Sequence, residues 1–279
     1  MLDPARIKEV MTDPLLSSAR VLDGLFYRGS VVVEADSDAR FYQSVSRKCD
    51  PALDLHFVNA DNKQTVPRIL AIYRELGVAS AGIVDIDILN DPAEFDKQLE
   101  AAGIKEPSLS SARSMRSQIA QTVGEESPEA RISRLRERME ELQRLLPPEA
   151  TSGAPTDATA MRKSLRQLES KLHEALDTIK VWAEIKRRGA QALPAEVRPQ
   201  FLALSDICAK GGFFINPEGE LESMLVDYGI RPTTDKRAWI QQALGLLPGL
   251  NVDRTKYPWK FIVAIHDYLT SSGNFAAGG

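Results

Sequence analysis

The sequence predicts an α/β protein built on a parallel sheet of about four strands flanked by helices. Three short apolar segments have the composition of strands, and two segments with helical periodicity separate them. The strands are expected at 30–34, 55–59 and 79–86, and the helices at 38–48 and 62–76. Strands alternating with helices are typical of a parallel sheet with crossover helices. Three consecutive valines, 31–33, indicate that the first strand is buried on both faces.

The remaining elements follow from the same patterns. Residues 1–29 predict one or two short helices, and residues 93–125 are mostly polar with helical character. The segment GGFFIN at 211–216 predicts a fourth strand. Three further helices are expected near the C-terminus, at 220–228, 237–246 and 259–269.

A helical arm is predicted to interrupt the α/β domain. Apolar residues recur in heptad steps from Ile132 to Leu146 and again from Met161 to Trp182, and a Pro/Ala/Thr-rich loop at 147–160 joins the two runs. Two such helices form an antiparallel coiled-coil hairpin. It either packs on itself or serves as a homodimer contact. The expected division is 1–107 for the first part of the core, 108–200 for the inserted arm and 201–279 for the rest of the core.

Composition restricts the class of protein. The 279 residues are 43% hydrophobic and 27% charged, with a formal net charge of −4. An acidic chain does not coat nucleic acid by its overall charge, so DNA binding would need a local basic surface or bound metal. The two cysteines are far apart, which argues against disulfides and a zinc site and favours the cytoplasm. No apolar run has membrane-spanning length, so no membrane association is expected.

Carboxylates follow the predicted strands. Glu34 ends the first strand, and Asp85 and Asp87 end the third. Ligands of parallel sheets bind beyond the carboxyl ends of the strands, and residues i and i+2 share a side. Converging carboxylates favour a hard cation, Mg²⁺ or Mn²⁺, and two such ions can clamp a phosphoryl displacement. Glu220 and Glu222, in the segment GELE after the fourth strand, extend the set.

A second interpretation applies to the acids after the first strand. Polar residues at that position often cap the following helix, and Asp36, Ser37 or Asp38 fits that role. Both interpretations remain open from the sequence.

The segments VVVEADSDARFY, NADNKQTVPRIL and GIVDIDILND resemble, in order and spacing, the TOPRIM domain of the OLD-family nucleases. The late GELE segment is also typical of that branch. The resemblance covers residues 20–105 and 210–230. It implies metal-dependent cleavage or nicking of DNA.

The resemblance also implies roles for individual residues. Glu34 would be a metal ligand or general acid/base, Lys63 would contact a phosphate, and Glu220 or Glu222 would complete a second metal site. The acids that would bind metal in the first site are Glu34, Asp38, Asp85 and Asp87. Two positions depart from the pattern: Ala35 replaces a glycine, and Glu218 stands where many relatives carry a basic residue.

The family resemblance further implies an ATPase partner. The chain lacks a G-x-x-x-x-G-K-[ST] loop, yet residues 13–29 resemble the stretch that joins an ABC-type ATPase to its TOPRIM domain. The expectation is a DNA endonuclease controlled by a separately encoded ABC-type ATPase, by analogy in defence against phage. The alternatives are the C-terminal half of a longer protein, or a catalytically weak subunit that assembles with an ATPase through its arm.

Overall fold

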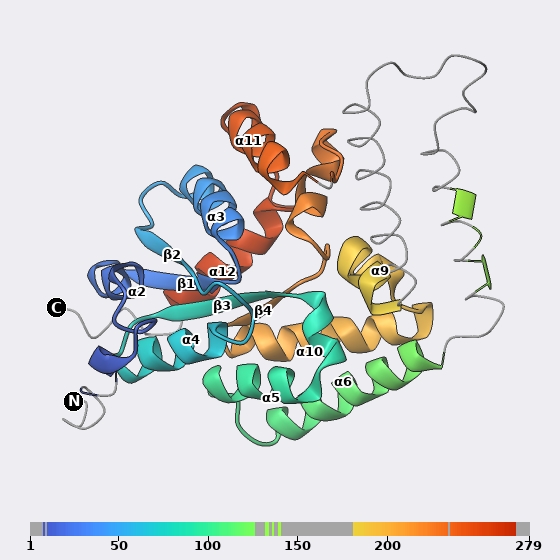
Figure 1. Ribbon diagram of the computed structural model, residues 1–279, viewed down its shortest axis with the longest axis horizontal. Coiled ribbons are helices and arrows are strands. Elements are labelled where there is room, and N and C mark those ends of the chain that lie inside the picture. The colour runs from blue at the N-terminus through green and yellow to red at the C-terminus, as the bar shows by residue number, and fades with distance from the viewer. Residues whose placement is uncertain are drawn as a thin grey trace, which may run out of the picture.

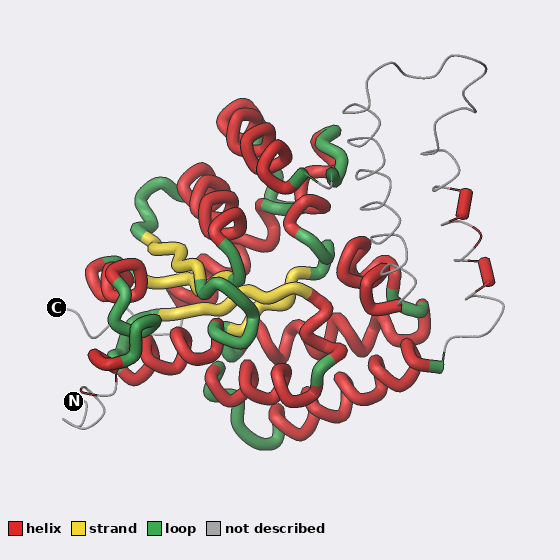
Figure 2. The backbone as a smooth tube through the Cα atoms, viewed as in Figure 1, coloured by secondary structure: helices red, strands yellow, loops and turns green. Residues whose placement is uncertain are grey.

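The computed structural model describes residues 8, 10–125, 132–133, 136, 139–140, 181–233 and 235–271. Its centre is a four-stranded sheet in which every pairing is parallel, in the order β2-β1-β3-β4. The strands are β1 (Gly29–Val33), β2 (Leu55–Asn59), β3 (Ser80–Asp85) and β4 (Phe213–Asn216). Figure 2 shows the strands side by side between layers of helix. The predicted α/β class and parallel sheet are therefore confirmed.

Helices cover both faces of the sheet (Figure 1). One face carries α3 (Asp36–Cys49), α11 (Lys236–Leu246) and α12 (Trp259–Ser271). The other packs against α4 (Val66–Glu75), α5 (Pro92–Ala101), α6 (Ser108–Gly124), α9 (Val181–Arg188) and α10 (Arg198–Lys210). The short helix α2 (Ala19–Asp23) precedes β1. The sheet is thus the middle layer of three.

The strands feed two separate cores because successive side chains point to opposite faces. In β1, Val32 joins the core beneath α4, whereas Val31 and Val33 join the core beneath α3. All three valines are fully buried, and each such burial stabilises the fold by about 1.5–3 kcal/mol. β1 is therefore buried on both faces, as its three consecutive valines predict.

Two 3-10 helices follow strands on the carboxyl side. They are η2 (Ile86–Asn90) after β3 and η5 (Leu221–Tyr228) after β4. The other 3-10 turns are η1 (Gly24–Phe26), η3 (Gly189–Ala192), η4 (Ala195–Val197) and η6 (Leu247–Gly249). The short helix expected at 220–228 is present as the 3-10 helix η5, with Glu220 as its N-cap.

Two predicted helices have different bounds. The helix expected from residue 62 begins at Val66, because Asn62 Oδ1 accepts a 3.0 Å hydrogen bond from Thr65 N and holds a turn first. The segment at 93–125 divides into α5 and α6. Gly103, with a φ of +65°, takes the left-handed conformation that ends α5.

The two ends of the 108–200 segment pack on the sheet. Ala112, Ile119 and Val123 of α6 and Ile185 of α9 belong to the same core as α4. The predicted heptad hairpin lies mainly at 126–180, outside the described residues, so the arm and its homodimer contact remain predictions. Among the described residues, no helix is long and apolar enough to cross a membrane.

Candidate metal and phosphate site

Glu34 and Asp85 meet at the carboxyl edge of the sheet. β1 and β3 are neighbours, with Val32 opposite Gly82, so the residues that follow them emerge side by side. The backbone N–H of Asp85 donates a 3.0 Å hydrogen bond to Glu34 Oε1. The parallel pairing therefore brings together two acids that lie far apart in the sequence.

Two lysines face the aspartates that end β3. Lys186 Nζ lies 3.6 Å from Asp85 Oδ2 and 3.5 Å from Asp87 Oδ2, and Lys63 Nζ lies 3.2 Å from the same Asp87 oxygen. Within the described residues, the other oxygen, Asp87 Oδ1, is buried and has no hydrogen-bond partner. A buried acceptor without a donor is rare and costly. We call Glu34, Asp85, Asp87, Lys63 and Lys186 the strand-end cluster.

Electrostatics in this cluster are dominated by burial and crowding. Burial raises the pKa of Glu34, partly offset by the Asp85 amide. Burial and the nearby Glu34 charge hold the pKa of Asp85 well above its usual range. Burial alone would lower the pKa of Lys186, but Asp85, Asp87 and Glu34 together raise it. Carboxylates so arranged need positive charge to stay ionised.

Asp38 has a structural role at the start of α3. The N-cap of α3 is Ala35, so the expectation that Asp36, Ser37 or Asp38 caps the helix is wrong. Asp38 lies in the first turn instead, and its Oδ2 accepts a 3.1 Å hydrogen bond from Ala35 N. Burial, and then the charges of Glu34 and Glu222, raise the pKa of Asp38 to about 7. A carboxyl group with that pKa can exchange a proton near neutral pH.

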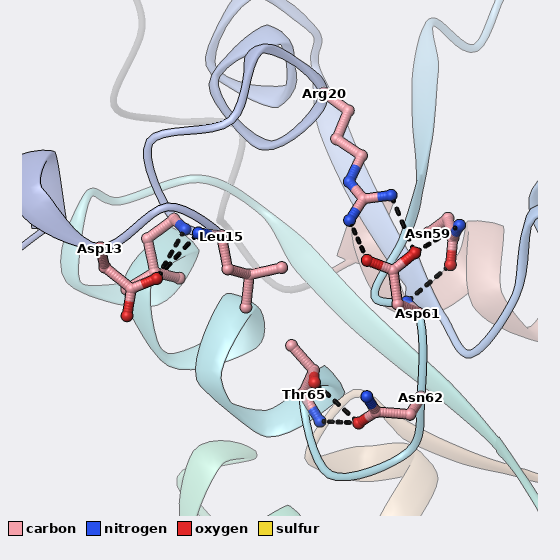
Figure 3. Close-up of polar contacts among 8 residues, drawn as sticks. Asp13, Leu15, Arg20, Asn59, Asp61, Asn62 and Thr65 are labelled. Carbon is pink, nitrogen blue, oxygen red and sulfur yellow. Dashed lines mark hydrogen bonds and ion pairs between the residues drawn. The ribbon is translucent and has the colours of Figure 1, made fainter.

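The loop that carries Lys63 is held by a strained residue. Asp61 has a φ of +68°, in the left-handed region that non-glycine residues rarely adopt. Its carboxylate forms a two-pronged ion pair with Arg20 (Figure 3). Asn59 Oδ1 accepts a 2.7 Å hydrogen bond from Asp61 N, and Gln98 Nε2 donates a 2.9 Å bond to the Lys63 carbonyl. Lys63 is therefore presented by a loop with a defined conformation.

The helix that carries Lys186 is docked by close backbone contact. Gly189 and Gly219 both have positive φ, +66° and +87°. A Cβ on Gly189 would lie 2.1 Å from Pro217 O, and one on Gly219 would lie 2.2 Å from Lys186 O. Ala190 N also donates a 2.8 Å hydrogen bond to Pro217 O. Only glycine allows this approach, which joins the end of α9 to the turn after β4.

A second group of acids follows β4. Lys236 Nζ lies 3.8 Å from Glu220 Oε1 and 3.7 Å from Glu222 Oε1; we call these three residues the turn cluster. Burial raises the pKa of Glu222, and within the described residues its Oε2 is buried without a partner. Because the Glu222 charge also raises the pKa of Asp38, the turn cluster adjoins the strand-end cluster.

Lys186 and Lys236 were not among the candidate site residues from the sequence. Lys186 belongs to the basic run 186–188, which is equally explained by the preference for cations at a helix C-terminus. Lys236 opens α11 with no motif around it. Nothing local to either lysine indicates a carboxylate partner, since their partners belong to distant elements.

The donor chemistry of the strand-end cluster fits a hard divalent cation. Its acids offer oxygen donors only, which suit Mg²⁺ or Mn²⁺, and Asp87 Oδ1 is a buried oxygen that lacks a partner among the described residues. In the part of the chain that the structure describes, no three His, Cys, Asp or Glu side chains are grouped as ligands around one point. Instead, the Lys186 ammonium lies between Asp85 and Asp87.

Comparison with known protein families, with curated proteins and with solved structures gave no match.

Proposed function

We propose that this protein is a metal-dependent phosphodiesterase that cleaves or nicks DNA. The observation that carries the proposal is the convergence of Glu34, Asp85 and Asp87 at one edge of a parallel sheet, with the buried Asp87 Oδ1 unpartnered within the described residues. Ligands of open parallel sheets bind at this edge. The resemblance of the same segments to the TOPRIM domain of OLD-family nucleases supports the reaction class.

In this proposal each group has a distinct task. Glu34, Asp85 and Asp87 would hold Mg²⁺ or Mn²⁺, which would polarise the phosphate and stabilise its developing charge. Lys63 lies at the rim of the site and would neutralise a phosphate oxygen. Asp38, with a pKa of about 7, would take up or release a proton. Glu220 and Glu222 would form a second metal site, which requires displacement of Lys236.

The wider proposal concerns the setting of the reaction. The protein would act in the cytoplasm, with DNA as substrate and a separately encoded ABC-type ATPase as partner. The arm predicted within 108–200 would provide the contact with that ATPase or with a second copy of the chain. Phage defence is the analogous role among related ATPase–TOPRIM pairs.

The decisive experiment is nicking of supercoiled plasmid in Mn²⁺, with and without any ABC-type ATPase encoded by an adjacent gene. Wild-type protein should convert supercoiled to nicked DNA. Glu34→Gln should reduce the rate by about 100-fold or more, because loss of one charged ligand removes several kcal/mol of transition-state stabilisation. Glu196→Gln, at an exposed position in η4, is the matched control and should act like wild type. Equal rates for wild type and Glu34→Gln would refute the proposal.

One observation favours a second candidate, the catalytically weak subunit that assembles with an ATPase. Lys63 and Lys186 already neutralise part of the charge on Asp85 and Asp87, so the acids have a structural use without metal. This candidate predicts no binding of Mg²⁺ or Mn²⁺ in calorimetry. Saturable binding that is lost in Asp85→Asn would count against it.

A further inference from the structure

Lys186 contacts both aspartates at the end of β3, Asp85 and Asp87. Its Nζ is 3.6 Å from Asp85 Oδ2 and 3.5 Å from Asp87 Oδ2, whereas Lys63 forms its ion pair with Asp87. The charges of Asp85, Asp87 and Glu34 all act on Lys186. Lys186 thus bridges the carboxylates that the proposed function assigns to a divalent ion.

The contacts of Lys186 are electrostatic rather than tight hydrogen bonds. Hydrogen bonds between charged N–H and O atoms are about 2.7–2.9 Å long, shorter than either contact that Lys186 makes. The ammonium therefore balances charge without being locked to one oxygen. A contact of this kind is readily exchanged for a cation of higher charge.

The side chain of Lys186 can leave while its helix stays. Its backbone is held where Gly189 and Gly219 meet, and Ser223 Oγ donates a 3.1 Å hydrogen bond to the neighbouring Arg187 carbonyl. Its side chain, in contrast, is 35% exposed and consists of four flexible methylenes. Rotation about these bonds moves Nζ into water without disturbing α9.

We propose that Lys186 is a resident counter-cation, which neutralises Asp85 and Asp87 until a divalent metal ion displaces it. The inference rests on the proposed function. Mg²⁺ binds carboxylate oxygens at about 2.0–2.1 Å, and an ion that close to the aspartates would repel an ammonium group in its present place. Lys186 therefore weakens metal binding and sets the concentration at which the site fills.

The test is calorimetric titration of the full-length chain with Mn²⁺. Lys186→Gln removes the charge but keeps a hydrogen-bond donor, and it should bind Mn²⁺ about tenfold more tightly than wild type. Lys186→Arg keeps the charge and should not gain affinity. Lys97→Met is the matched control, because it removes the same charge from an exposed ion pair with Glu94 in α5, and it should retain the wild-type affinity.

A second measurement uses wild-type protein, so the test does not depend on the variant folding. With ¹³C-labelled lysine, Mg²⁺ should shift the Lys186 Cε signal toward that of a solvent-exposed lysine, and the signal is assigned by its loss in Lys186→Arg. An unchanged signal at saturating Mg²⁺ overturns the inference.

The outcomes separate this inference from the proposed function. If nicking depends on Glu34 but Lys186→Gln binds Mn²⁺ no more tightly than wild type, the counter-cation role is wrong and the function stands. If neither protein binds Mn²⁺, both proposals are wrong. Tighter binding in Lys186→Gln, with wild-type affinity in Lys97→Met, supports the counter-cation role.

Discussion

The strand-end cluster and the turn cluster both combine carboxylates with lysine, but they differ in how the fold supports them. In the strand-end cluster, the side chains of Lys63 and Asp87 are 24% and 18% exposed. In the turn cluster, Lys236 is 60% exposed and Glu220 is 29% exposed, with Glu222 alone deeply buried. Charges interact more strongly as water is excluded, so the first cluster should respond more to the loss of a single charge.

Backbone geometry explains this difference. Two hydrogen-bonded strands hold Glu34 and Asp85, and a backbone amide fixes the carboxylate of Glu34. Glu220 and Glu222 follow a single strand and are paired with one lysine at the start of α11. Neighbouring strands therefore hold the strand-end acids, whereas the acids of the turn cluster lack that support.

The first expected effect is on metal affinity. Asp87→Asn removes the acid whose Oδ1 is buried without a partner in the described chain, and Mn²⁺ affinity should fall at least about tenfold, equivalent to about 1.4 kcal/mol. Glu220→Gln, which removes the more exposed acid of the turn cluster, should reduce it less than about threefold. Calorimetry in the same buffer compares the two. Equal losses would remove the distinction between the clusters.

The next effect is on stability, and it concerns the close contact between Gly189 and Pro217. Gly189→Ala introduces a Cβ 2.1 Å from Pro217 O at a φ of +66°. The free energy of unfolding should fall by at least about 2 kcal/mol, from left-handed strain and steric overlap. Gly245→Ala in α11 is the control, since a Cβ there meets nothing within 4 Å, and it should be neutral or stabilising by up to about 1 kcal/mol. Urea denaturation measures both, and equal stability in the two variants would contradict the close docking.

The third prediction concerns the pH dependence of stability. It involves Asp38, which adjoins both clusters. Its pKa is about 7 in the folded protein, above the usual 3.8. Below pH 4 Asp38 is protonated in both the folded and the unfolded protein, so its full contribution to the free energy of unfolding is present there. As pH rises toward 7, Asp38 loses its proton in the unfolded protein but keeps it in the folded protein. The free energy of unfolding therefore falls over this range. The loss should be of the order of 4 kcal/mol.

Asp38→Asn isolates this effect. The stability difference between pH 5 and pH 8, measured by denaturation in chelator, should be smaller in the variant than in wild type, because asparagine does not titrate. Part of the difference should remain, since the pKa values of Glu34, Asp85 and Glu222 are also raised. Asp36→Asn, at an exposed neighbouring position, should keep the wild-type difference. An unchanged pH profile in Asp38→Asn would contradict the raised pKa.

The smallest expected effect lies in the loop that brings Lys63 to the strand-end cluster. Asp61→Ala keeps the φ of +68° but loses the exposed pair with Arg20, and it should cost about 1 kcal/mol. Asp61→Gly loses the same pair but relieves the strain, so it should cost less than half as much. Thermal unfolding can rank the two. Equal costs would show that backbone strain contributes little to this loop.

Much of the fold was predictable because its signals are local. The valines of β1 and the strand ends at Glu34 and Asp85 follow from polarity patterns over a few residues. Helix limits were less predictable, because side-chain bonds such as that from Thr65 N to Asn62 decide where α4 begins. The role of Asp38 was left open, since capping a helix and binding a metal both call for an acid there.

The sequence alone determined the parallel sheet, the placement of Glu34, Asp85 and Asp87 at strand ends, and the resemblance that suggests their chemistry. Tertiary structure decided which cations reach these acids. Lys186 arrives on α9, docked through Gly189 and Gly219, and Lys236 arrives on α11. The physical reason is the distance along the sequence over which each feature is decided. Strand patterns depend on adjacent residues, whereas charge pairing depends on how distant elements pack.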